Sequence, residues 1–168
     1  TGEATVTSTL TFTSANWDTA QTVTVTGTDD DVIDGTVAST ITLSINDGSS
    51  DNNFDSVSDQ TVSVSTTDDD VAGFTIAETD SSTSVSESGT TDTFTIVLNA
   101  QPSSDVVLSV TSGDTGEATV TGTITFTSAN WDTAQTVTVT GVDDDLIDGT
   151  VTSTITVSVV DAASDNNF

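Results

Sequence analysis

The sequence of 168 residues contains no lysine, arginine or histidine, and this absence excludes several functions. Its 27 acidic residues give a formal net charge of −27 at pH 7. Without cationic side chains the protein has nothing to neutralise the phosphates of a nucleic acid or to be attracted to an anionic membrane. No salt bridge between side chains can form within it. We therefore expect divalent cations to supply the missing positive charge.

Cysteine is also absent, so no disulfide stabilises the fold. Because both cysteine and histidine are missing, Ser–His and Cys–His catalysis are excluded, and a bound metal must rely on oxygen ligands. Proline occurs only at Pro102, and no segment is long and apolar enough to insert into a membrane. The apolar residues, 33% of the sequence, lie in ordered alternation, which favours a folded chain that depends on ions over a disordered one.

The residues that are present form an internal repeat. Residues 1–54 recur at an offset of 114 as residues 115–168, with 44 of the 54 positions identical and mild differences such as Leu10 for Ile124. A period of this length suits a whole domain rather than a solenoid repeat. We predict a window from an array: residues 1–70 form the C-terminal part of one domain, and residues 71–168 form the next domain without its last strand.

Threonine alternates with valine, isoleucine, leucine and phenylalanine along the chain, as in Thr119–Phe126. This period of two, with many β-branched residues and frequent turns, predicts an all-β fold, an antiparallel sandwich. Seven strands are expected, six of them near residues 73–77, 92–98, 106–110, 118–126, 136–141 and 151–159. The seventh is seen only in the earlier copy, near residues 57–66.

Acidic residues gather in the loops that this strand order places at one end of the sandwich. In the second domain these residues are Glu87, Asp114, Glu117, Asp143, Asp144, Asp145 and Asp148. In the preceding copy they are Asp29, Asp30, Asp31, Asp34 and the exit run Asp68, Asp69 and Asp70. Because Val71 opens the next domain directly after this run, we expect the acidic cluster to lie at a domain junction.

So many neighbouring carboxylates repel one another and lose hydration unless a cation is present. Calcium accepts roughly six to eight oxygen ligands in flexible geometry, whereas magnesium demands octahedral geometry and keeps its waters. We therefore predict Ca²⁺ as the bound ion. The segment Asp143–Gly149 is not an EF-hand loop, because Thr154 stands where the bidentate glutamate would fall. The alternative is that these aspartates are solvated turn residues.

Other patterns point to function less directly. The triplet Asp114-Thr115-Gly116 matches an aspartic-peptidase signature, but that enzyme needs two such loops that share a proton. The two carboxylates of a glycosidase would need an aromatic-lined cleft, and the few aromatic residues do not indicate one. We therefore predict no enzyme.

Trp17 and Trp131 are predicted to cap the core, with sugar stacking as the alternative. Residues 164–168 form either an Asx turn or further oxygen ligands for a junction ion.

Several segments together resemble the Calx-beta domain. They are the run Asp68–Asp70 before Val71–Glu78, the segment Val85–Gly89, and Thr123–Phe126 followed by a Thr-Val strand and Asp143–Asp145. The resemblance covers essentially the whole 114-residue unit and implies tandem seven-stranded immunoglobulin-like Greek-key sandwiches. It implies calcium ligands at Glu87, Asp114, Asp143, Asp144, Asp145 and Asp148, and in the preceding domain at Asp29, Asp30, Asp31, Asp34, Asp68, Asp69 and Asp70. Glu78 is a further candidate ligand.

Near-identical tandem copies, rich in threonine and aspartate, also resemble the extender region of giant calcium-dependent bacterial surface adhesins of the repeats-in-toxin type. This resemblance implies a secreted or cell-surface stalk, concerned with cell adhesion and biofilm, whose partners are neighbouring repeats and calcium ions. One alternative is a filament or matrix subunit, in which one chain supplies a missing strand to another. A carbohydrate-binding module centred on Trp131 is the third reading.

Overall fold

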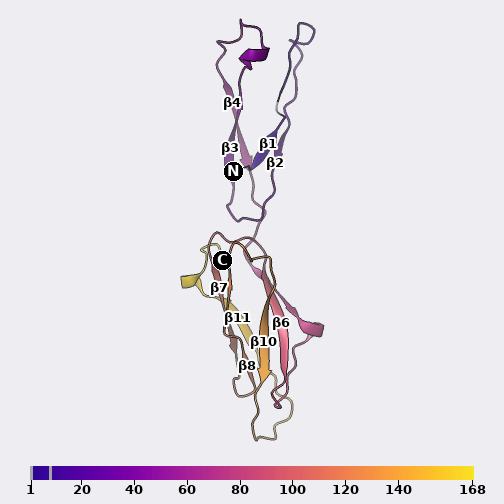
Figure 1. Ribbon diagram of the computed structural model, residues 1–168, viewed down its shortest axis with the longest axis vertical. Helices are drawn as coiled ribbons and strands as arrows, with labels where there is room; N and C mark the ends of the chain where they lie inside the picture. Colours follow the sequence, from indigo (N-terminus) through magenta and orange to yellow (C-terminus); the bar gives the residue numbers. More distant parts are fainter. Residues whose placement is uncertain (1, 8) are drawn as a thin grey trace. The chain divides into compact units, whose positions relative to one another are not determined.

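The computed structural model describes residues 2–7 and 9–168 and divides into two compact units (Figure 1). Unit 1 comprises Thr1–Asp30 and Asp34–Asp69, and unit 2 comprises Asp31–Ile33 and Asp70–Phe168. Thr1, the predicted start of the first domain, lies outside the described residues. All regular structure is β apart from three short 3-10 helices, and no described helix is long and apolar enough to cross a membrane.

Unit 2 has two antiparallel sheets. The strand order is β5-β6-β10-β8 in the four-stranded sheet and β11-β7-β9 in the three-stranded sheet. The strands are β5 (Phe74–Glu78), β6 (Thr91–Leu98), β7 (Val106–Ser112), β8 (Ala118–Val120), β9 (Thr123–Phe126), β10 (Gln135–Gly141) and β11 (Ile155–Val159). The 3-10 helices of this unit are η2 (Thr79–Ser81) and η3 (Asp161–Ala163).

The core of unit 2 forms where both sheets turn their apolar side chains inward. Phe94 and Ile96 of β6 are buried at alternate positions, as are Val106 and Leu108 of β7, and all four belong to one cluster with Phe126. The intervening residues of these strands are more exposed. Because side chains alternate between the two faces of a strand, the period of two in the sequence becomes a buried face and a polar face. The predicted all-β class is confirmed, and the arrangement is consistent with a β-sandwich.

The single strand predicted over residues 118–126 is wrong, because the chain changes sheets within it. β8 pairs with β10, whereas β9 pairs with β7. The change occurs between adjacent residues: the amide of Thr121 donates to the carbonyl of Thr138, while the carbonyl of Gly122 accepts from the amide of Val110. A continuous Thr-apolar pattern does not reveal such a switch, because both halves bury the same face.

Most other predicted strands agree with the structure. The strands predicted near 73–77, 92–98, 106–110 and 136–141 are found as β5, β6, β7 and β10, each end within two residues. The predicted strand 151–159 is shorter than expected, because regular pairing begins only at Ile155. This strand lies at the edge of its sheet and pairs with β7 alone among the described strands.

Unit 1 consists of two antiparallel strand pairs. β1 (Ala4–Val6) pairs with β2 (Val25–Gly27), and β3 (Val37–Leu43) pairs with β4 (Gln60–Thr66), while η1 (Asp47–Ser49) lies between β3 and β4. β4 is the predicted strand near 57–66, and its pairing with β3 runs without a break from Val37 opposite Thr66 to Leu43 opposite Gln60.

Candidate metal centre

The turn that leads into β8 positions Glu117. The amide of Gly116 donates to Asp114 Oδ1 at 3.0 Å, which forms an Asx turn, and the amide of Ala118 donates to the Asp114 carbonyl at 3.1 Å. An aspartate side chain that bonds to the backbone two residues on is a usual way of building such a turn. The carbonyl of Glu117 accepts from the amide of Val142 at 2.9 Å. Glu117 is thereby held beside the loop that follows β10.

That loop supplies the other two carboxylates. The amide of Leu146 donates to Asp144 Oδ1 at 2.7 Å, so a second Asx turn shapes the segment. Asp148 is followed by Gly149, whose φ of 77° lies in the left-handed region that favours glycine. Asp148 thus directly precedes a left-handed glycine on the way from β10 to β11.

A close approach of two backbone segments at Gly141 brings a third loop to the same end of unit 2. A Cβ atom at Gly141 would collide with the backbone carbonyl of Ser86. The Gly141 amide also donates to the carbonyl of Thr90 at 3.0 Å. Because glycine has no side chain, the loop before β6 can pack directly on β10, and it carries Glu87 with it.

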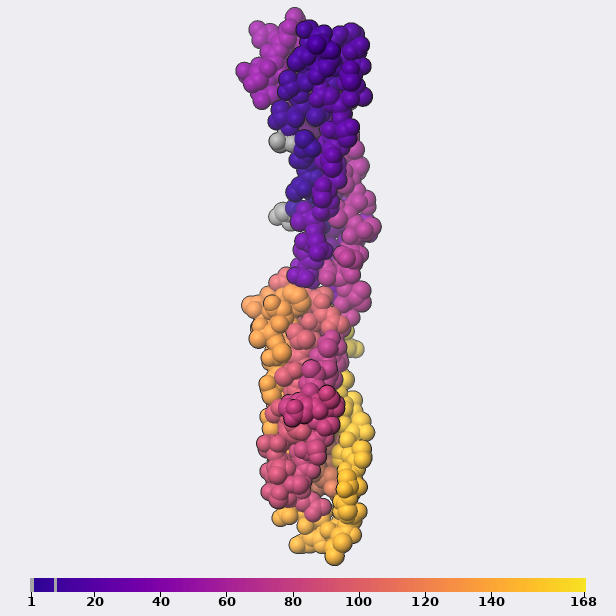
Figure 2. Space-filling model, turned by 90° about the vertical axis from the view of Figure 1, so that its right-hand side faces the viewer, coloured from indigo at the N-terminus to yellow at the C-terminus, as the bar shows by residue number. Residues whose placement is uncertain are grey.

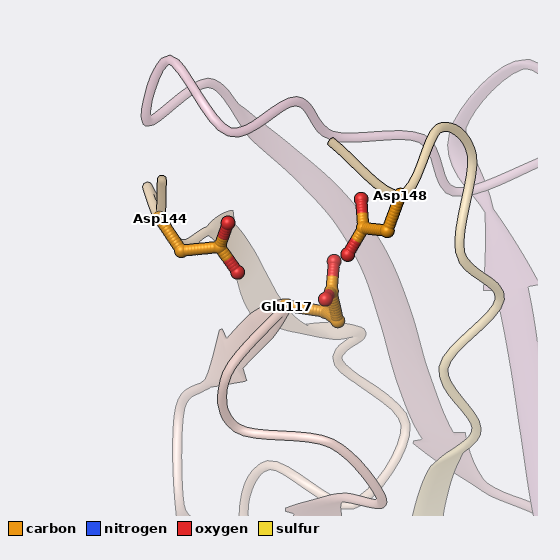
Figure 3. Close-up of side chains that lie close together, drawn as sticks. All are labelled: Glu117, Asp144 and Asp148. Atoms are coloured by element: carbon orange, nitrogen blue, oxygen red, sulfur yellow. The ribbon is translucent and has the colours of Figure 1, made fainter. Parts of the chain in front are cut away.

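Three carboxylates meet in this region (Figure 3). One ligand oxygen each from Glu117, Asp144 and Asp148 lies within 4.8 Å of the others. Glu117 and Asp144 are half-buried, and Asp148 is exposed. Among the described residues this is the one group of three or more potential metal ligands at such distances.

The electrostatic surroundings of Glu117 involve acids from several loops of unit 2. The pKa of Glu117 is raised above its ordinary value of 4.5, first because its carboxylate is desolvated and then because other carboxylates repel its charge. In decreasing order these carboxylates belong to Asp148, Asp144, Asp114 and Glu87. They come from the connections after β5, β7 and β10, which are the loops that the strand order predicted to lie together.

The ligands predicted within residues 71–168 are therefore placed unequally. Asp144 and Asp148 lie in the three-carboxylate group, while Glu87 and Asp114 are close enough to affect Glu117. The remaining three are exposed and lie outside the group: Asp143, Asp145 and Glu78. Glu78 instead accepts a hydrogen bond from the hydroxyl of Thr83 at 3.0 Å.

Glu117 itself is missing from the ligands that the resemblance implied, although it was counted among the acids at this end. The signal that identifies it is its position at the end of the Asp114 turn, one residue before β8. In unit 1, Asp68 Oδ2 accepts from the amide of Gly35 at 2.7 Å. For the other acids of residues 1–70, as for Asp68, the ligand role stays a prediction; these are Asp29, Asp30, Asp31, Asp34, Asp69 and Asp70.

Such a group can hold a hard cation. Carboxylate oxygens are the ligands preferred by calcium, magnesium and manganese, and the donor set contains neither nitrogen nor sulfur. Three carboxylates supply only part of a calcium coordination sphere, so backbone carbonyls, water or the nearby Asp114 and Glu87 would complete it. A bound cation would also relieve the repulsion that raises the pKa of Glu117.

The other candidate features have structural roles in unit 2. Trp131 packs against the core cluster, as predicted, and its carbonyl accepts from the amide of Leu98 at 3.1 Å. The same prediction for Trp17 is wrong, because this side chain is 71% exposed. Asp165 forms an Asx turn, one of the two alternatives for residues 164–168, with the amide of Asn167 donating to its Oδ1 at 2.9 Å. The other carboxylate oxygen of Asp165, Oδ2, accepts from the Ser103 hydroxyl at 2.6 Å and from the Ser104 amide at 2.8 Å. These bonds hold its pKa at about 2, below the ordinary 3.8.

Comparisons of the chain with models of protein families, with curated proteins and with solved structures found no match.

Proposed function

We propose that this chain is a non-catalytic structural repeat of a secreted or cell-surface protein, an extender of a bacterial adhesin that calcium makes rigid. Its domains would be Calx-beta-like, seven-stranded Greek-key sandwiches with a period of 114 residues. The internal sequence repeat, the all-β structure and the acidic group of unit 2 support this proposal. A stalk of this kind would carry a distal binding domain away from the cell.

The observation that carries the proposal is the convergence of Glu117, Asp144 and Asp148. These residues come from two separate loops, and two more acids add to the repulsion at Glu117. Like charges at such distances destabilise a fold unless a counter-charge is present, and the sequence provides no cationic side chain. A divalent cation is the simplest source of that charge.

Calcium would act by ordering acidic loops. With the ion bound, loops that otherwise repel one another are held in a single arrangement. In the sequence, Asp68–Asp70 directly precede Val71, so acidic residues also flank the start of the proposed next domain. Calcium sites of extracellular modules have Kd values of roughly 10⁻⁴ to 10⁻³ M, which suits an ion that is plentiful only outside cells.

The test is thermal unfolding of the full chain with about 10 mM CaCl₂, with the same concentration of MgCl₂, and with EGTA. A site in the affinity range above predicts that calcium raises the Tm by several degrees, through preferential binding to the folded state. Glu117→Gln should remove most of this rise. Asp161→Asn is the matched control, because it removes an equal charge from an exposed residue outside the group. Equal stability in calcium and EGTA would refute the proposal.

The effect of pH provides an independent check, because the folded state raises the pKa of Glu117 above 4.5. Without a cation, this residue favours the folded state below its ordinary pKa, and that contribution is lost as the pH rises through the raised value. Calcium requires the ionised carboxylate, so the calcium-induced rise in Tm should be larger at pH 7 than at pH 4.5. A rise that is independent of pH would place calcium at another site.

A further inference from the structure

Unit 2 includes three residues, Asp31–Ile33, that belong in the sequence to the earlier copy of the repeat. The amide of Gln101 donates to the carbonyl of Asp31 at 2.7 Å, and the middle residue of the tripeptide forms an isolated parallel bridge with Gln101. The side-chain amide of Asn167 donates to the carbonyl of Ile33 at 3.0 Å. Unit 2 therefore holds this tripeptide by backbone groups at both of its ends.

The loop after β6 holds Gln101 firmly in place. Gln101 precedes Pro102, the single proline of the sequence, and a residue before proline favours an extended backbone over a helical one. Ala100 and Pro102 on either side are buried, and the Gln101 side chain donates to the carbonyl of Ser128 at 2.8 Å. Because Gln101 is fixed by these neighbours, its amide can bind a carbonyl at little further cost in conformational entropy.

Asp165 ties the turn that carries Asn167 to the same loop. Its Oδ1 accepts from the Asn167 amide, and its Oδ2 accepts from the Ser103 hydroxyl and the Ser104 amide. The Asp165 side chain is only 5% exposed. Figure 2 shows the yellow part of the sequence, which contains β11 and the residues after it, at the surface along one side of unit 2. A buried group thus holds Gln101 and Asn167 at a fixed spacing on an exposed part of the unit.

The equivalent turn of unit 1 shows that the turn itself does not require the contact with Ile33. Asn53 is the equivalent of Asn167, and its backbone amide likewise donates to Asp51 Oδ1 at 2.9 Å. The Asn53 side-chain amide donates to the same oxygen at 2.8 Å, whereas the Asn167 side chain donates to the carbonyl of Ile33. Since the turn forms with the side chain in either place, the bond to Ile33 is a separate interaction that recognises the tripeptide.

The aliphatic side chains of the tripeptide are partly covered in this position. Val32 and Ile33 are half-buried. Their equivalents in the repeat, Leu146 and Ile147, have exposed fractions of 68% and 105%, so the loop itself does not cover these side chains. The covering of Val32 and Ile33 therefore comes from outside their own loop, and the removal of aliphatic surface from water favours the bound arrangement.

We propose that Gln101 and Asn167 form a docking site for the loop of a neighbouring repeat, and that its ligand is an acidic residue followed by two aliphatic residues. Asp31–Ile33 is the tripeptide bound there, and Asp145–Ile147 is the same element in the second copy of the repeat. Asp165 is a positioning residue of this site. The description of the two copies as neighbouring repeats rests on the proposed function, whereas the docking itself uses neither calcium nor the three-carboxylate group.

The test is the hydrogen-exchange rate of the Gln101 amide in the full chain, measured by NMR in EDTA. The double variant Val32→Ser, Ile33→Ser removes the aliphatic side chains of the bound tripeptide. We expect the Gln101 amide to exchange about tenfold faster in this variant, because its hydrogen bond opens more often. The matched control is Leu146→Ser, Ile147→Ser, which should leave the rate unchanged. Equal Gln101 rates in the original chain and in the first variant would overturn the proposal.

The amide of Asp165 reports whether unit 2 stays folded, because it donates to the carbonyl of Asp105 at 2.8 Å, away from the tripeptide. Its exchange should remain slow in both double variants. Asn167→Ala removes the side-chain donor but keeps the backbone amide of the turn, so it should also speed exchange at Gln101 severalfold. Asn53→Ala, at the equivalent position, should have no effect. The same rate in both alanine variants would overturn the role of Asn167.

Val32→Leu tests whether docking is a property of the repeat rather than of one loop. This single change makes the first tripeptide identical to Asp145–Ile147, so the Gln101 amide should keep its slow exchange. Fast exchange in this variant would show that the second tripeptide does not fit the site, and would overturn docking as a general contact between repeats. Because EDTA is present throughout, failure here is distinct from failure of the proposed calcium site, which is judged by stability in calcium and EGTA.

Discussion

Units 1 and 2 place nearly the same sequence in two different surroundings. Phe126 is completely buried in the core of unit 2, whereas its equivalent Phe12 is 54% exposed. Residues 123–126 form β9, but residues 9–12 form no strand. Unit 2 contains β6 and β7, which pair with and cover the repeated segment, and the described part of unit 1 has no equivalent of them. A period-two pattern therefore becomes strand and core only where a partner strand is present.

Local turns behave differently, because they are the same in both units. Asn16 Oδ1 accepts from the amide of Thr13 just as Asn130 Oδ1 accepts from the amide of Thr127. The Asx turn at Asp165 has its counterpart at Asp51, where the Asn53 amide donates at 2.9 Å. These bonds span two or three residues, so the sequence alone is enough to form them.

The largest expected difference in stability between the two units is that between the variants Phe126→Ala and Phe12→Ala. The first should destabilise unit 2 by about 3–5 kcal/mol, because it leaves a cavity in a closed core. The second should change stability by about 0.5 kcal/mol or less, since the side chain is largely in solvent. Denaturant unfolding followed by Trp131 fluorescence, in a Trp17→Phe background, reports on unit 2. Similar losses for both variants would mean that Phe12 is covered in solution.

A smaller difference is expected for Gly141→Ala and Gly27→Ala. A Cβ atom at Gly141 would collide with the Ser86 carbonyl, so the loop that carries Glu87 must move, at a cost of about 3 kcal/mol. At Gly27 the nearest atom would be the Thr66 methyl group at 3.7 Å, an ordinary contact. Thermal unfolding of both variants measures the difference. A tolerated alanine at residue 141 would show that the approach of this loop is not required for stability.

The fold was predictable from sequence where strands show alternating polar and apolar residues. This alternation located β5, β6, β7 and β10, because the apolar residues of each strand lie on one face. It missed the change of sheet at Thr121-Gly122, where the buried face continues while the hydrogen-bond partners change. It also extended β11 over residues 151–154, which pair as strand only in the copy where β4 lies alongside.

The candidate site was predictable as a region rather than as a set of ligands. Strand order alone indicated that the loops bearing Glu87, Asp114 and Asp144 share one end of the domain. Which carboxylates converge depends on the local backbone, which is shaped by the Asx turns at Asp114 and Asp144 and by the left-handed conformation of Gly149. Glu117 was not assigned as a ligand for this reason, and Asp143 and Asp145 were assigned although they lie outside the group.

The smallest expected difference in stability is that between the variants Asp165→Asn and Asp51→Asn. The Asp165 side chain is buried and bonded to Ser103 and Ser104, whereas Asp51 has the same turn but is exposed. Asp165→Asn should cost about 1–2 kcal/mol at pH 7, because charge-assisted hydrogen bonds are lost, and Asp51→Asn about 0.5 kcal/mol or less.

The pKa of Asp165 is lowered from 3.8 to about 2, so its contribution to stability is present above pH 3.8 and is lost as the pH falls through about 2. The two variants should therefore diverge at pH 7 and approach each other in stability near pH 2, as measured by denaturant unfolding at both pH values. If the difference between them were the same at both pH values, it would arise from packing of the side chain rather than from its ionised carboxylate. The loop around Ser103 and Ser104 would then be held by shape, and the burial of Asp165 would be a consequence of the closed core rather than one of its causes.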